Sequence, residues 1–67
     1  MWYIVSTSGK EIMVNMDHVY KAVYVAEEGH VLLLFVTGGS LVCPGTPAEV
    51  FAEENKLIFE RTLTSGW

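Results

Sequence analysis

Few side chains in this sequence could serve as a nucleophile, a base or a metal ligand. The one combination from which such a site could be built consists of His18, His30 and Cys43, with Asp17 and either Glu27 or Glu28 near them in sequence. These residue types can hold a zinc ion or form a cysteine–histidine nucleophile pair. Their spacings match no local signature of either site, and a free cysteine at a strand end is typically a small buried hydrophobic residue. We therefore predict a non-enzymatic protein with no catalytic residue, no metal site and no cofactor.

Glycine and carboxylate motifs have structural interpretations as well. The Gly38-Gly39-Ser40 segment is followed by no helix start and belongs to neither phosphate-loop pattern, so we interpret it as a hairpin turn. The Glu27-Glu28 and Glu53-Glu54 pairs are assigned to a loop tip and to an outer helix face, where both are solvated.

The net charge and the positions of the aromatic residues indicate which kinds of partner this protein could bind. The net charge of −4 opposes phosphate neutralisation, and only four basic residues accompany the eight aromatic ones, so the sequence predicts no nucleic-acid partner. Tyr20 and Tyr24 alternate with alanines along one predicted strand. Their rings would leave clefts beside them, which makes these two tyrosines the candidate ligand-binding residues for a small apolar molecule or another chain.

The chain is long enough for one small domain. It has 67 residues, of which 51% are hydrophobic. We predict a single domain over residues 1–67 with a loose tail at 64–67. The fold class is α+β and mainly β: a small antiparallel sheet of five or six strands, with a barrel-like form as one alternative, and one short helix near the C-terminus.

The first two strands are predicted to form a hairpin. Residues 2–7 end at a Ser8-Gly9-Lys10 turn, and a second run covers residues 11–15. Alternation predicts that Trp2 and Ile4 face the core together with Ile12, Val14 and Met16. A short connection at residues 15–18 follows.

A third strand over residues 19–26 and a fourth over 31–36 form the next predicted hairpin. The fourth strand is apolar on both faces, so it is predicted to be central and covered on both sides. One short helix cannot cover all of this surface, and we predict a homo-oligomer, a dimer or larger, with another protein as a further possible partner. The predicted interface residues are Trp2, Leu32, Leu34, Phe35 and Val36.

The clearest helix start lies late in the chain, after a short strand at 41–43. Thr46-Pro47-Ala48-Glu49 combines a capping threonine, a proline at the first helical position and a glutamate at the third. The helix is predicted from Pro47 to about Glu54. Residues 57–63 alternate as a last strand would, although a continued helix also fits their seven-residue spacing.

The N-terminus has no basic region and no cleavage site, and glycines and prolines interrupt the uncharged stretch at 29–48. We therefore expect a cytoplasmic protein that makes no membrane contact.

Several of these segments, in this order, resemble the FlbD/SwrD family of small flagellar and swarming-motility proteins. The resemblance covers about residues 4–54 and rests on Gly9-Lys10-Glu11-Ile12, Val14-Asn15, Asp17 and Thr46-Pro47-Ala48-Glu49-Val50. It implies a hairpin, a strand pair, a C-terminal helix and a motility-associated role. The strand and helix order is also similar to that of the LytTR DNA-binding domain, but the acidic charge balance opposes that function.

Overall fold

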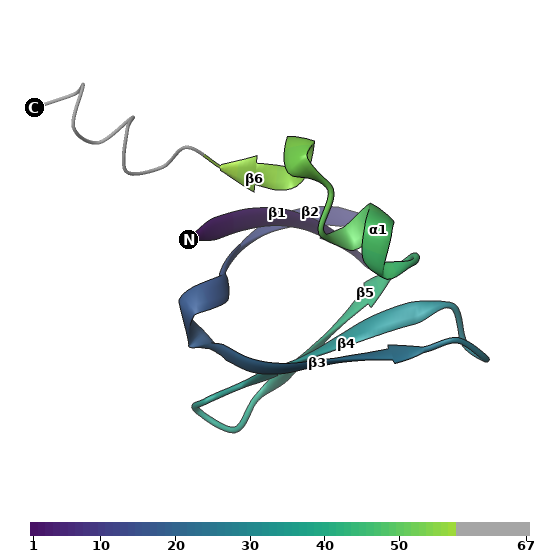
Figure 1. Cartoon of the computed structure of the whole chain (residues 1–67), viewed down its shortest axis with the longest axis horizontal. Coiled ribbons are helices and arrows are strands. Elements are labelled where there is room, and N and C mark those ends of the chain that lie inside the picture. Colours follow the sequence, from purple (N-terminus) through teal and green to yellow (C-terminus); the bar gives the residue numbers. More distant parts are fainter. Residues whose placement is uncertain (58–67) are drawn as a thin grey trace, which may run out of the picture.

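The chain folds into two small antiparallel sheets around a shared core. The structure is a computed structural model that describes residues 1–57 (Figure 1). The first sheet has the order β2-β1-β6 and the second the order β3-β4-β5. The strands are β1 (Trp2–Thr7), β2 (Lys10–Asn15), β3 (Val19–Val25), β4 (His30–Phe35), β5 (Ser40–Pro44) and β6 (Lys56–Leu57). The helical elements are η1 (Met16–His18), α1 (Pro47–Val50) and η2 (Glu53–Asn55).

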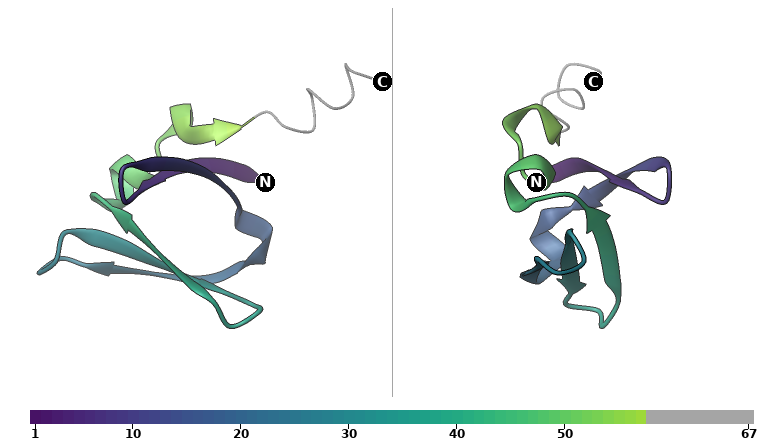
Figure 2. Two further views of the ribbon diagram at one scale, coloured as in Figure 1. Left: turned by 180° about the vertical axis from the view of Figure 1, so that it is seen from behind. Right: turned by 90° about the vertical axis from the view of Figure 1, so that its right-hand side faces the viewer.

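The mainly β prediction is confirmed, and the described residues contain six strands, but these strands form two sheets of three and not the single sheet that was predicted. The 3-10 turn η1 takes the chain out of the first sheet: Asn15 Oδ1 accepts a hydrogen bond from the Asp17 amide at 3.1 Å. The chain then enters the second sheet, where the Val36 amide donates to the His18 carbonyl at 2.9 Å. β5 contacts β1, so the sheets lie close together without sharing a ladder (Figure 1). The strands of the two hairpins cross in direction, as the right-hand view of Figure 2 shows.

The β1–β2 hairpin forms as predicted, with Thr7 opposite Lys10 and a two-residue loop. Both loop residues have positive φ, 48° at Ser8 and 76° at Gly9. This is the pattern of a type I′ turn, whose twist matches that of the flanking strands.

The core-facing side of β1 differs from the prediction. Tyr3 lies opposite Val14 and Val5 opposite Ile12, whereas Ile4 lies opposite Met13. Since opposed residues share a face, Tyr3 and Val5 face the core. Trp2 and Ile4 therefore share the other face with Met13. The turn length sets this register, and a shift of one residue exchanges the faces.

β4 is the central strand of the second sheet, as predicted. Its Val31 and Leu33 are 1% and 0% exposed and form the middle of the core. The other buried core residues are Val5, Val14, Cys43 and Val50. They come from both sheets and from α1, so this single cluster joins the two sheets. Beside it, the rings of Tyr3 and Phe51 meet edge to face, with centroids 6.4 Å apart.

The helix α1 begins where the sequence predicts and ends earlier. Thr46 Oγ1 accepts from the Glu49 amide at 3.3 Å, and Glu49 Oε1 accepts from the Thr46 amide at 3.0 Å, which completes the capping box. The Thr46 amide, and the Thr46 hydroxyl group at 3.0 Å, both donate to the Glu49 carboxylate and so lower the pKa of Glu49. The predicted extension to Glu54 is wrong: the Asn55 side-chain amide donates to the Glu49 and Val50 carbonyls at 2.7 and 3.1 Å. It satisfies carbonyl groups that a longer helix would have bonded internally.

The predicted last strand is observed at its start only. β6 pairs with β1 through Lys56 and Leu57, and the predicted remainder at 58–63 and the tail at 64–67 lie outside the described residues. Within residues 1–57, no helix has the length and apolar character needed to cross a membrane.

We expect Gly9→Ala to lower the free energy of unfolding by about 1 kcal/mol, because alanine is strained at positive φ. A methyl group at Gly9 meets no atom within 4 Å, so the loss reports backbone strain rather than a clash. Gly39→Ala is the matched control, since Gly39 does not have a positive φ. A methyl group added there would lie 4.0 Å from the Phe35 side chain, its nearest neighbour. Urea unfolding of both variants tests this. Equal stability of the two variants would contradict the assigned turn.

Candidate functional site

The most distinctive surface is the side of the β3-β4-β5 sheet that points away from the core, which we call the outer face. Pairing register places its residues in three rows, each crossing all three strands. The rows are Lys21, Leu34 and Ser40; Val23, Leu32 and Val42; and Val25, His30 and Pro44. The middle row is therefore entirely apolar.

None of the described elements outside this sheet covers the outer face. The first sheet, α1 and η2 all lie above β3, β4 and β5 in Figure 1, on the core side. Val42, in the middle row, is 44% exposed. Leu32 and Leu34 are only half-buried, although they alternate with the fully buried Val31 and Leu33. An apolar surface of this kind on a small domain indicates an interaction site.

The outer face has charges of opposite sign at its two ends. Lys21 is an exposed residue in the first row. Beyond the third row, the β3–β4 turn contains the exposed Glu27 and Glu28. Glu28 Oε2 lies 3.6 Å from His30 Nδ1, so a carboxylate lies beside the outer face. The face is therefore apolar in the middle, basic at one end and acidic at the other.

A second feature is a groove of about 370 Å³ beside β2. β2 is an edge strand of the first sheet, and the end of the β4–β5 hairpin forms the opposite wall. Its apolar lining includes Trp2, Ile12, Phe35 and Leu41, and its polar lining includes His18 and Ser40. A concave apolar site with a few polar groups is typical of small-ligand pockets.

The structure distributes the predicted interface residues over several places. Leu32 and Leu34 lie on the outer face. Val36 follows β4 and is 62% exposed. Phe35 packs against the core instead, and Trp2 lines the groove. The five residues therefore do not form one surface.

Tyr20 and Tyr24 do not follow the simple alternation predicted for them. The pairing register shifts between Val19 and Lys21, so a bulge at Tyr20 breaks the pattern. Tyr24 lies opposite Val31, on the core side of this edge strand, and is 44% exposed. Neither tyrosine lines the groove beside β2.

The titratable residues are not brought together. Cys43 lies opposite Val31 on the core side, whereas His30 lies opposite Pro44 on the outer face. Asp17 Oδ2 is 2.8 Å from the N-terminal ammonium group. Within residues 1–57, no group of three or more histidine, cysteine or acidic residues has an arrangement that could hold a metal ion.

Val23 and Val42 are the residues of this surface that sequence reasoning missed. Each is an ordinary strand valine, and nothing in its local sequence marks it. Their common row with Leu32 depends on the lengths of the β3–β4 and β4–β5 turns, which set the register. Counting residues outward from the two turns would have placed both valines beside Leu32.

Comparisons with protein-family models, with curated proteins and with solved structures find no match to this chain.

We expect the Cys43 thiol to react with Ellman's reagent at least about tenfold more slowly in the folded protein than in guanidinium chloride at pH 8. Cys43 is 1% exposed, and its burial raises the pKa of the thiol above the ordinary value of a cysteine. Because the thiol pKa is higher in the folded state, the free energy of unfolding should fall as the pH rises above the pKa of this thiol in the unfolded chain. Equal reaction rates in the two states would mean that the thiol is accessible, contrary to its position in the core.

Proposed function

We propose that this protein is a non-enzymatic interaction module that self-associates through the outer face of its β3-β4-β5 sheet. The observation that carries this proposal is the apolar middle row, Val23, Leu32 and Val42, which no described element covers. Burying such a row against a second copy removes apolar surface from water and so favours association.

The size of the domain supports the same proposal. A chain of about 60 residues buries only about 60% of the surface that its unfolded form exposes, which leaves little stability to spare. The core of the described part contains six buried residues. Pairing through the outer face would give β4 a second covered side, as its two apolar faces require.

A motility-associated role, as in the FlbD/SwrD family that the sequence resembles, is a narrower form of this proposal. The residues that carry the resemblance lie in the β1–β2 hairpin, in η1 and in α1. Each of these segments has a structural task, a turn or a cap, so they support a similar fold more directly than a shared partner. The narrower role would require the outer face to contact a second protein as well.

The groove beside β2 favours a second candidate function, the binding of a small molecule with an apolar body. Its volume of about 370 Å³ falls within the range of about 300–1,000 Å³ typical of ligand sites. Trp2 and Phe35 provide aromatic walls, and His18 and Ser40 provide polar atoms at the lining.

The self-association proposal is tested by Val42→Glu. Val42 is already 44% exposed, so a glutamate there should leave the fold intact, but it would place a charge in the middle of the interface. We expect the dimer dissociation constant to rise by about tenfold or more. Sedimentation equilibrium over a wide concentration range, with circular dichroism to verify folding, measures this.

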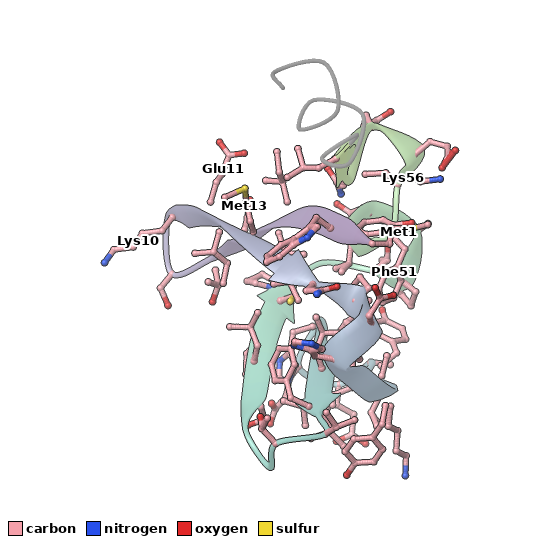
Figure 3. The ribbon with its side chains drawn as sticks, turned by 90° about the vertical axis from the view of Figure 1, so that its left-hand side faces the viewer. Met1, Lys10, Glu11, Met13, Phe51 and Lys56 are labelled. Atoms are coloured by element: carbon pink, nitrogen blue, oxygen red, sulfur yellow. The ribbon has the colours of Figure 1, made fainter. Side chains whose placement is uncertain are left out.

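The matched control is Met13→Glu. Met13 is 58% exposed and lies on β2 of the first sheet, so it is not part of the outer face (Figure 3). We expect its dissociation constant to equal that of the unchanged chain. A folded Val42→Glu variant that associates as well as the unchanged chain would refute the proposed interface.

The groove is tested with the fluorescent apolar probe 8-anilinonaphthalene-1-sulfonate. If the groove binds apolar molecules, Thr37→Trp should weaken probe binding by about threefold or more, because an added indole at the lining fills the space. Val42→Glu separates the two surfaces, since it changes the outer face and leaves the groove lining unaltered. Probe binding that depends on Val42 and not on Thr37 would assign the probe to the outer face instead.

A further inference from the structure

The three rows of the outer face restrict how two copies could pack. Successive rows are two residues apart along each strand, which corresponds to about 7 Å. The middle row is apolar across all three strands, whereas the first row contains Lys21 and the third leads to the acidic turn. The face is thus polarised along the strand direction, with its apolar centre between opposite charges.

A dimer of identical copies has a two-fold axis, which for two packed faces lies in the plane between them. If the axis ran parallel to the strands, the acidic β3–β4 turns of both copies would lie at the same end of the dimer. Four carboxylates from Glu27 and Glu28 would then gather at one end, and no Lys21 would meet a carboxylate. With a net charge of −4 on each copy, this arrangement adds repulsion.

If the axis runs along the middle row, the strands of the two copies are antiparallel across the interface. The middle rows then meet, so that Val23, Leu32 and Val42 each face the same residue of the second copy. The first row of one copy lies over the third row of the other, and β3 lies over β3. Lys21 therefore faces the region of Val25 and the acidic turn of the second copy, where Glu28 lies 3.6 Å from His30.

We infer that two copies of this chain pair through their outer faces about a two-fold axis along the Val23, Leu32 and Val42 row, with each Lys21 against the acidic β3–β4 turn of the other copy. This inference rests on the proposed self-association and adds the orientation of the second copy. The apolar row supplies the affinity, and the two symmetric Lys21 to Glu28 contacts select the antiparallel arrangement. Packed sheets lie about 10 Å apart, a gap that the lysine side chain of one copy and the glutamate side chain of the other can bridge together.

Charge reversal tests the orientation in the full chain. At low ionic strength we expect Lys21→Glu and Glu28→Lys each to raise the dimer dissociation constant by about fivefold or more, because each changes two attractive contacts into two repulsive ones. The double variant Lys21→Glu/Glu28→Lys restores both contacts with their signs exchanged. Its dissociation constant should return to within about twofold of the unchanged chain, and the effects of the single variants should shrink in 0.5 M NaCl.

Two control variants separate local contacts from net charge. Lys10→Glu and Glu11→Lys make the same changes in net charge, at exposed positions on the β1–β2 hairpin (Figure 3). We expect both to associate like the unchanged chain. If the control variants changed the dissociation constant as much as the variants at Lys21 and Glu28 do, the inference would be overturned. The dissociation constant would then depend on net charge alone.

The remaining outcomes distinguish the two proposals. A dimer that Val42→Glu disrupts but that both single charge reversals leave unchanged would keep the interface and overturn the antiparallel orientation. Weakened single variants without recovery in the double variant would also overturn it. A chain that stays monomeric at all concentrations, with or without Val42→Glu, would overturn self-association itself.

Discussion

The architecture depends on a constraint at β4, which is apolar on both faces. The chain covers one face, where Val31 and Leu33 lie under the first sheet and α1. In the described structure, the other face has no second layer. Each apolar face of a sheet needs a second layer packed against it. The described part of this chain provides such a layer on the core side only. The middle row of the outer face is left uncovered as a direct result, with Val42 exposed and Val23 and Leu32 half-buried.

The connection between the two sheets also shapes the outer face. η1 turns the chain out of the first sheet at Asn15, and the bulge at Tyr20 then changes the alternation of β3. As a result Val19 packs against the core on one side of the bulge, and Lys21 lies on the outer face on the other. Without the bulge, alternation from Val19 would put Lys21 on the core side. The bulge therefore places this lysine on the outer face.

Polar chemistry in this protein serves mainly local structure. Thr46 and Glu49 cap α1, Asn55 ends it, and Asn15 shapes η1. Glu28 differs, because its carboxylate lies 3.6 Å from His30, which is on the outer face. The same carboxylate therefore belongs both to a turn and to the proposed contact with a second copy. Recognition through such a surface would rest on burial for affinity and on charge placement for orientation.

The sequence by itself determined the local features of the fold. The turn at Ser8-Gly9, the Asx connection at Asn15 and the capping box at Thr46 depend on residues within three or four positions of one another, so their types predict their structure. The central place of β4 was also predictable, because a strand apolar on both faces must have neighbours. The candidate residues Leu32 and Leu34 followed from the same pattern.

The tertiary structure decided which strands share a sheet, which side of β1 faces the core and where α1 ends. These features depend on register and on distant partners: Val5 opposite Ile12, Leu32 opposite Val42, and Asn55 on the carbonyls of α1. Alternating apolar residues show that a strand has two faces, but they do not show which face is buried. The elements that pack against the strand decide that.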